Sequence, residues 1–144
     1  MKKRLSAHPD RCRDCQACVL ACSLVFEDRC SPYLARLRID KDMHKYEFGM
    51  TICRHCDTPA CEAACPTAAI SVDGRDVAIL DDGECTRCGA CAQACPHEAL
   101  FYSSAADRYL KCDLCVGRAD GPVCVQVCPV QALEVVRVTG RGEE

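Results

Sequence analysis

The sequence predicts a small α+β protein built from two interlocked halves, with short helices, hairpins and long loops. Three observations lead to this fold class. A length of 144 residues suits one domain or two small halves packed closely together. Seventeen of these residues are cysteines, and sixteen of them fall into four regularly spaced motifs. A segment of the form Cys-Pro-x-x-Ala-(Ile/Leu) occurs three times, at Cys65, Cys95 and Cys128, each time before a strand-like run.

Cysteine dominates the composition. Seventeen of 144 residues is about 12%, above the roughly 8–10% that marks a scaffold built on cysteine. The 49% hydrophobic content counts these cysteines, and the sequence has no Trp and only three Phe, so an ordinary side-chain core would be thin. Small scaffolds of this kind are held together by disulfides or by metal.

The redox compartment favours metal over disulfides. The basic start Met1–Arg4 is followed by polar residues where a signal peptide would be apolar, and no apolar run approaches the ~20 residues of a membrane span. We therefore expect a cytoplasmic protein without a membrane segment, in which the thiols stay reduced. The net charge of −3, with no long block of either sign, argues against nucleic acid as a partner.

The four motifs share one spacing rule, because each ends with a three-residue step to its last cysteine. The motifs are Cys12-x2-Cys15-x2-Cys18-x3-Cys22, Cys53-x2-Cys56-x4-Cys61-x3-Cys65-Pro66, Cys85-x2-Cys88-x2-Cys91-x3-Cys95-Pro96 and Cys112-x2-Cys115-x8-Cys124-x3-Cys128-Pro129. Three thiolates on a tight loop can hold three corners of a [4Fe-4S] cube, with backbone amides turned inward. A cysteine one helical turn later serves the neighbouring cube, so motifs work in pairs and sixteen cysteines predict four [4Fe-4S] clusters.

The other elements follow from local signals. Proline after the last cysteine should end a short helix in motifs two, three and four, whereas motif one has Ser23 there. Between Cys30 and Thr51 the stretch Leu34–Ile39 alternates in polarity and predicts a half-buried strand. Residues 70–80 predict a hairpin that turns at Asp73-Gly74. The strand-like runs after the three repeats are Ser71-Val72, Phe101-Tyr102 and Glu134-Val135-Val136.

Together these elements predict two interlocked bacterial-type dicluster ferredoxin units. Motifs two and three form an inner half over residues 50–102. Motifs one and four form an outer half from residues 1–49 and 103–138, which includes a strand insertion at 31–50. The glycine-rich residues 139–144 are expected to be a flexible tail.

The clusters would make the protein far more negative than its sequence. Sixteen ligating thiolates and four cluster cores of about +2 each bring the net charge to roughly −11. Four cations adjoin cluster cysteines: Arg13, Arg54, Arg87 and Lys111. Either they are solvated surface charges, or they tune a potential or dock a partner.

The cysteines admit other interpretations. Structural zinc prefers two separated Cys-x-x-Cys pairs per ion, unlike the single run from Cys85 to Cys95. A catalytic cluster needs an iron without a protein ligand, and every cube here can be given four thiolates. A redox sensor or maturation factor is a further alternative. Cys30 is expected to be buried as a small apolar residue, and His55 and His97 are expected to pack or hydrogen-bond rather than to ligate.

The four motifs in order, with Lys111-Cys112-Asp113-Leu114-Cys115 in the last, resemble the four-cluster iron-sulfur subunits of molybdenum and tungsten oxidoreductases from Arg11 to Val138. Cys18-Val19-Leu20-Ala21-Cys22-Ser23-Leu24 followed by Leu34-Ala35-Arg36-Leu37-Arg38-Ile39 is most similar to the ferredoxin-like subunit of tungsten-dependent aldehyde oxidoreductase complexes. Similar subunits accompany formate dehydrogenases, hydrogenases and carbon monoxide dehydrogenases.

The resemblance implies that motif one pairs with motif four, and motif two with motif three. The implied ligands are Cys12, Cys15, Cys18 and Cys128 for cluster 1; Cys22, Cys112, Cys115 and Cys124 for cluster 2; Cys53, Cys56, Cys61 and Cys95 for cluster 3; and Cys65, Cys85, Cys88 and Cys91 for cluster 4.

The resemblance also implies a non-catalytic role. Electrons would come from a tungsten- or molybdenum-pterin catalytic subunit that oxidises aldehydes. They would leave to a flavin-containing NAD-linked subunit, to a ferredoxin, or to further copies of this protein in a longer relay.

Overall fold

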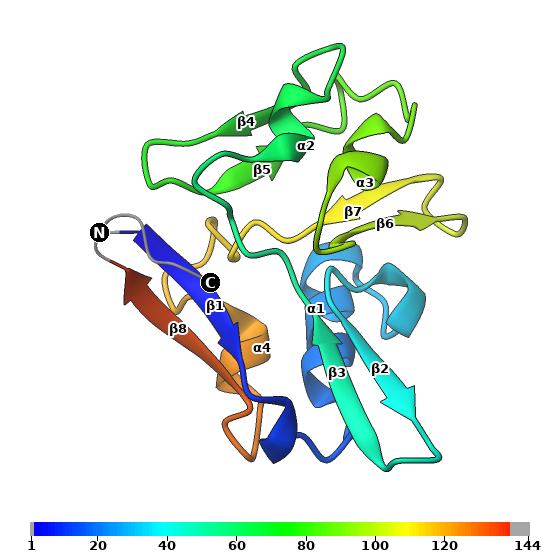
Figure 1. Cartoon of the computed structure of the whole chain (residues 1–144), viewed down its shortest axis with the longest axis vertical. Helices are drawn as coiled ribbons and strands as arrows, with labels where there is room; N and C mark the ends of the chain where they lie inside the picture. Colours follow the sequence, from blue (N-terminus) through cyan, green and yellow to red (C-terminus); the bar gives the residue numbers. More distant parts are fainter. Residues whose placement is uncertain (1, 139–144) are drawn as a thin grey trace.

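The computed structural model describes residues 2–138, and it is a mixed α+β protein as the sequence predicts (Figure 1). The strands are β1 (Lys2–Ala7), β2 (Arg38–Asp42), β3 (Glu47–Thr51), β4 (Ile70–Val72), β5 (Ala78–Leu80), β6 (Leu100–Ser103), β7 (Arg108–Lys111) and β8 (Leu133–Val138). The helices are α1 (Ala17–Glu27), α2 (Ala60–Ala63), α3 (Ala90–Ala94) and α4 (Val123–Gln126), with 3-10 turns at Pro9–Arg11 and Pro32–Leu34. The tail expected at 139–144 lies outside the described residues.

The helices have the lengths that the proline rule predicts. α2, α3 and α4 span only four or five residues and end before a Cys-Pro pair. α1 continues for eleven residues because Ser23 stands where the other motifs have proline. Ser23 is fully buried, its hydroxyl donates to the Leu20 carbonyl, and it accepts the Ser31 amide at 2.9 Å. Within residues 2–138, no helix has both the length and the apolar character needed to cross a bilayer.

The strands form four separate antiparallel pairs, β1–β8, β2–β3, β4–β5 and β6–β7 (Figure 1). The β1–β8 pair was not predicted, because the basic start of the sequence carries little of the apolar alternation that marks a strand. In the structure Lys2 is opposite Val138 and Ala7 is opposite Leu133. This pairing fastens the start of the protein to the strand that follows motif four.

The strand expected at 34–39 is displaced. Pro32–Leu34 is a 3-10 turn capped by Ser31, and the strand begins only at Arg38. Leu34 and Leu37 are buried as their pattern suggested, but they reach the core from the turn and the bend before the strand. Proline favours this turn because its φ is fixed and it has no N–H to donate to a sheet. Residues 38–42 then pair with 47–51.

The predicted hairpin at 70–80 is present as β4–β5, but its turn is wider than the Asp-Gly pair suggested. The Asp73 carboxylate accepts the amides of Arg75 and Val77, each at 2.9 Å, and so organises residues 73–77. The strand-like runs after Cys95 and Cys128 are β6 and β8. The β6–β7 hairpin spans the boundary predicted between residues 102 and 103, so the two predicted halves share this element.

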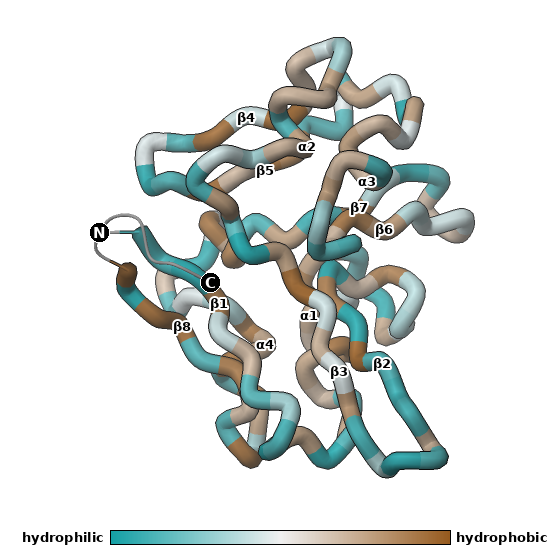
Figure 2. The backbone as a smooth tube through the Cα atoms, viewed as in Figure 1, coloured by the Kyte–Doolittle hydropathy of each residue, from teal (hydrophilic) through white to brown (hydrophobic). Residues whose placement is uncertain are grey.

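Cysteines take part in both hydrophobic cores. The larger core combines Leu5, Val19, Leu37, Ile52 and Leu133 with three cysteines, Cys18, Cys22 and Cys124. The smaller core combines Ile70, Ala78 and Leu100 with Cys61 and Cys91. Along the backbone, the outer end of the β2–β3 hairpin is hydrophilic, whereas apolar stretches lie near the centre and also at the outer end of β8 (Figure 2). Sulfur therefore occupies space that aliphatic side chains fill in most small domains.

Candidate metal centres

Two cavities in the inner part of the protein are each lined by four cysteines. The third cysteine group, Cys53, Cys56, Cys61 and Cys95, lines one cavity between α2 and the residues that follow α3. Burial raises the pKa of Cys56 and of Cys61, and the thiolates of Cys53 and Cys95 raise both further. The four cysteines therefore lie close enough for the negative charge of one thiolate to raise the pKa of another.

The fourth cysteine group, Cys65, Cys85, Cys88 and Cys91, lines the other cavity. Burial raises the pKa of Cys91, and the thiolates of Cys85 and Cys65 add to this rise. Cys65 comes from motif two, whereas the other three come from motif three. The helical step after Cys61 thus carries Cys65 to a neighbouring site, as its spacing predicts.

The first cysteine group joins residues from the two ends of the sequence. Burial in α1 raises the pKa of Cys18 to about 11, and the thiolates of Cys128, Cys12 and Cys15 contribute in the same direction. Cys128 is contributed by motif four and the other three by motif one. The β1–β8 pair and the contact of α1 with α4 bring these distant segments together.

The second cysteine group is Cys22, Cys112, Cys115 and Cys124. Burial raises the pKa of Cys22 to about 11, with a contribution from Cys115. Burial raises the pKa of Cys124 to about 12, and the thiolates of Cys22, Cys115 and Cys18 contribute as well. The effect of Cys18 on Cys124 shows that the first and second groups are neighbours.

Backbone amides point at the first cysteine of three motifs. The amide two residues on donates to the thiol in each case, at 3.4 Å from Asp14 to Cys12, 3.4 Å from Arg87 to Cys85 and 3.5 Å from Leu114 to Cys112. Asp14, Arg87 and Leu114 all have positive φ. The loops adopt unfavourable backbone conformations that aim N–H groups at sulfur, which favours a negatively charged group there.

In two motifs the last cysteine accepts a hydrogen bond from a backbone amide at the same spacing. Ala69 donates to Cys65 and Ala132 donates to Cys128, both at 3.2 Å and both from four residues further along the sequence. These donors follow the Cys-Pro pair of the repeat, so the repeat supplies a hydrogen bond as well as a ligand.

Gly89 shows how tightly one loop is packed. Its φ is +80°, and a Cβ atom at this position would lie 2.7 Å from the Tyr109 hydroxyl. A larger residue beside Cys88 would therefore adopt a strained backbone conformation and displace the Tyr109 hydroxyl.

The donor set fits a cluster better than a single ion. All seventeen cysteines are free thiols. Within residues 2–138, no three His, Cys, Asp or Glu side chains converge as a single metal ion requires. Instead the thiols of the third and fourth groups line two cavities, and backbone amides donate to several cysteines, which is the arrangement that a bulky anionic group held at its corners needs.

The cysteines also differ in their exposure to solvent. Among the sixteen predicted ligands only Cys15 and Cys88 are exposed, one in the first group and one in the fourth. Cys30 was expected to be buried, and this is wrong because it is exposed in the bend between α1 and Pro32. The polar Ser23, rather than Cys30, fills the buried space at this helix end, because its hydroxyl satisfies the Ser31 amide.

His55 and Lys111 are polar residues whose burial the sequence did not signal. His55 is 2% exposed and Lys111 is 3% exposed. Burial lowers the pKa of His55 to about 3, and the positive charges of Lys111 and Arg4 lower it further, so its imidazole is neutral. Both residues lie close to cluster cysteines in the sequence, and that proximity was the only signal that could have singled them out.

The comparisons with known proteins agree with this geometry. A family described as the 4Fe-4S dicluster domain matches residues 44–138, about two thirds of the sequence. The protein belongs to this family. A second family, the 4Fe-4S binding domain, matches residues 9–25 and so covers motif one of the dicluster protein. The dicluster protein therefore binds 4Fe-4S clusters.

Several proteins with redox names are similar to the dicluster protein. The relative named putative electron transport protein YsaA, from Escherichia coli, is 31% identical, over 96% of the dicluster protein and 92% of the relative. The polyferredoxin-like subunit of aliphatic sulfonate oxidoreductase from Pyrococcus furiosus is 35% identical, over 83% and 68%. The oxidoreductase AegA of Escherichia coli is 33% identical, but the dicluster protein spans only 22% of its length.

A solved structure has the same fold. A subunit of the active site complex BamBC of benzoyl coenzyme A reductase superposes with a TM-score of 0.57. The match covers 93% of the dicluster protein and 78% of that subunit, at 24% identity. At this identity the likeness concerns the fold.

Proposed function

We propose that this protein holds four [4Fe-4S] clusters and relays single electrons along them between larger redox partners. The observation that supports this most directly is that the third and fourth cysteine groups each line one cavity with four thiols. The proposed ligands are those of the first, second, third and fourth cysteine groups defined above. The two interlocked dicluster halves follow from this assignment. Motif one contributes Cys22 to the second group, and motif four contributes Cys128 to the first. In the same way, motif two contributes Cys65 to the fourth group, and motif three contributes Cys95 to the third.

The groups follow one another as a row. Cys18 and Cys124 interact between the first and second groups, and Cys112 and Cys53 interact between the second and third. α2, which carries Cys61, packs against α3, which carries Cys91 of the fourth group. A row of this kind divides a long electron transfer into short steps.

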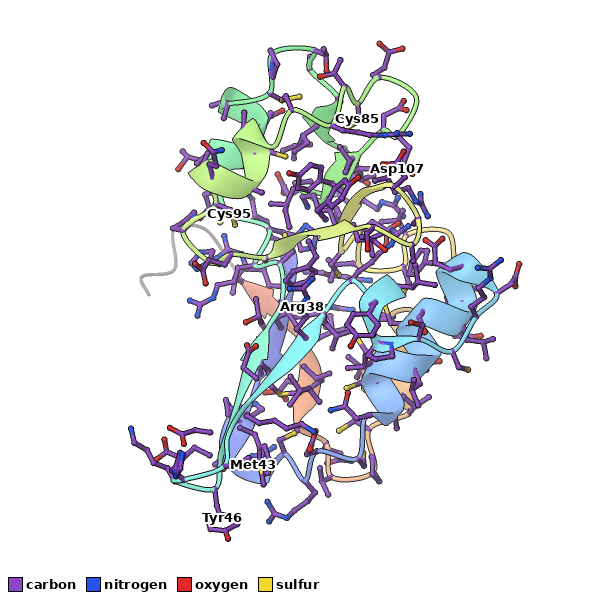
Figure 3. The ribbon with its side chains drawn as sticks, turned by 90° about the vertical axis from the view of Figure 1, so that its right-hand side faces the viewer. Arg38, Met43, Tyr46, Cys85, Cys95 and Asp107 are labelled. Carbon is purple, nitrogen blue, oxygen red and sulfur yellow. The ribbon has the colours of Figure 1, made fainter. Side chains whose placement is uncertain are left out.

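The two ends of the row reach the surface. The exposed Cys15 belongs to the first group and the exposed Cys88 to the fourth. Cys12 of the first group lines a hollow with Tyr46, at the tip of the β2–β3 hairpin. That tip, marked by Met43 and Tyr46, lies at the opposite end of the molecule from Cys85 of the fourth group (Figure 3). Electrons can therefore enter at one end and leave at the other.

The protein's own groups would set how easily each site accepts an electron. When bound, each cluster supplies a one-electron couple. The inward amides stabilise added negative charge, and burial of the inner thiols keeps water from screening it. Each site has four thiols, so none is left with an open ligand position for substrate.

We further propose a tungsten- or molybdenum-pterin catalytic subunit that oxidises aldehydes as the electron donor. The acceptor would be a flavin-containing NAD-linked subunit, a ferredoxin or another copy of this protein. The sequence resemblance supports this choice, and relatives named as subunits of thiosulfate reductase and of anaerobic dimethyl sulfoxide reductase support the broader class. A formate dehydrogenase, hydrogenase or carbon monoxide dehydrogenase complex is the alternative. The proposed compartment is the cytoplasm, where thiols stay reduced.

Metal analysis tests the cluster count. Protein purified without oxygen should contain about sixteen iron and about sixteen acid-labile sulfide per molecule, because each cubane contributes four of each. Stoichiometric zinc with little iron would contradict the proposed function. The Cys30→Ser variant is the matched control and should keep the full content, since Cys30 is exposed and belongs to none of the four groups.

A further inference from the structure

Lys111 is a buried cation placed between two cysteine groups. Its ammonium donates to the Cys53 thiol at 3.3 Å, to the carbonyl of Cys112 at 3.2 Å and to the carbonyl of Ala78. An ammonium has three donors, and here all three have acceptors. Cys53 belongs to the third group and Cys112 to the second, so the side chain stands at the junction of the two halves.

The positive charge of Lys111 lacks a carboxylate partner. Among residues 2–138, no Asp or Glu oxygen forms an ion pair with its ammonium. A buried charge is costly unless an opposite charge compensates it. The sulfur of Cys53 is the acceptor that can carry that charge, so the site is built for an anionic group at the third cysteine group.

His55 presents a second buried donor at the same cavity. Its Nδ1 accepts the Ala78 amide at 3.2 Å, so the proton of the neutral ring lies on Nε2. Nε2 is buried and has no hydrogen-bond partner among the described residues. His55 lines the cavity of the third group together with Cys53 and Cys56. An anionic sulfur in that cavity would supply the acceptor that Nε2–H lacks.

Ala78 connects the two donors. Its carbonyl accepts from Lys111 and its amide donates to His55, so one residue of β5 holds both side chains in place. Apart from cysteines, His55 and Lys111 are the ionisable side chains that are buried in residues 2–138, and both face the third group.

Two of the cations near the other groups are paired with carboxylates. Arg36, beside Cys22 of the second group, pairs with Asp113 at 3.2 Å. Arg87, beside Cys88 of the fourth group, pairs with Asp107, and its side chain is 51% exposed. Each of these charges is therefore weakened by a carboxylate, by water or by both.

We infer that Lys111 and His55 make the third group, Cys53, Cys56, Cys61 and Cys95, the site that the first electron occupies. This inference rests on the proposed function. An uncompensated cation and a free N–H donor both stabilise the extra negative charge of the reduced state, and low local polarity strengthens both. The site is internal to the row, so it would store one electron between entry at one end and exit at the other. Both residues act as positioning and electrostatic groups, not as ligands.

A redox titration of the intact protein, followed by electron spin resonance, tests this inference. In Lys111→Met the cluster reduced first in the unmodified protein should become harder to reduce. Its ratio of reduced to oxidised form at a fixed potential should fall at least tenfold, which is about 59 mV for a one-electron couple. Lys111→Arg keeps the positive charge, so its ratio of reduced to oxidised cluster should stay close to that of the unmodified protein.

His55 provides an independent variant. His55→Leu removes the Nε2–H donor and should lower the same ratio about threefold to tenfold, because the oxidised cluster accepts the same hydrogen bond and only its strengthening on reduction is lost. His55→Gln keeps an N–H donor and should lose less. The signal that shifts should be the one whose g-values change in Cys61→Ser, because Cys61 belongs to the third group.

Arg75→Met is the matched control. It removes one positive charge from an exposed ion pair with Asp73, so no cluster should shift by more than about threefold. If Lys111→Met and His55→Leu keep about sixteen iron and leave every ratio unchanged, the inference is overturned while the proposed function stands. If the Lys111→Met protein does not bind its clusters, the comparison of His55→Leu with His55→Gln tests the inference by itself. Absence of clusters from the unmodified protein would overturn the proposed function itself.

Discussion

Removal of iron is expected to unfold this protein. Five cysteines belong to its two hydrophobic cores, and in the smaller core the buried aliphatic residues are Ile70, Ala78 and Leu100. Without a metal group the cavities of the third and fourth groups would be empty spaces lined by thiols. The free energy of cluster binding then contributes to the free energy of folding. The loss of this contribution should exceed the whole stability of a small domain, about 5–15 kcal/mol.

Circular dichroism of the intact protein measures this effect. The loaded protein should melt cooperatively, whereas protein treated with an iron chelator under anaerobic, reducing conditions should show no cooperative transition. Reconstitution with iron and sulfide should restore the transition, which separates metal loss from chemical damage. A metal-free protein that keeps the same melting transition would show that the side-chain cores suffice without the clusters.

Cys128→Ser is expected to perturb the cluster that the first group holds, although Cys128 is far from Cys12, Cys15 and Cys18 in the sequence. The structure brings Cys128 close enough to influence the Cys18 thiol. Serine oxygen is a poorer ligand for iron than thiolate, so that one cluster should change its spin-resonance signal or lose iron, while the other three remain.

Cys95→Ser is the matched control for this experiment. Cys95 has the same place before proline in motif three, but it lines the cavity of the third group. Its replacement should alter the cluster of Cys53, Cys56 and Cys61 and leave the first group intact. If Cys128→Ser altered the third or fourth group instead, the proposed pairing of motifs would be wrong.

Local chemistry explains why much of the fold could be predicted. Proline ends a helix wherever it occurs, so the short helices before Pro66, Pro96 and Pro129 were predictable, and so was the longer α1 at Ser23. The hairpin at 70–80 and the strands after Cys95 and Cys128 follow from turn residues and alternating apolar residues. These signals act within a few residues and depend little on the rest of the sequence.

Features that depend on distant partners were missed or misplaced. β1 is a strand because β8 pairs with it, and its own sequence Lys2–Ala7 is mostly polar. The strand expected at 34–39 gave way to a turn because Leu34 and Leu37 reach the core without a sheet. Cys30 was assigned to the interior by residue type alone, but it lies in an exposed bend.

The sequence by itself determined the chemistry of the proposed sites: sixteen thiols, spaced so that each run of three can enclose one cube and the fourth can reach a neighbour. That spacing is local geometry, fixed by the loop and by one helical turn. Only the tertiary structure decided which groups adjoin, because Cys112 and Cys53 meet through packing between distant segments. The same packing buried Lys111 and His55 against one group of four, since burial and charge compensation depend on what the whole protein places around a side chain.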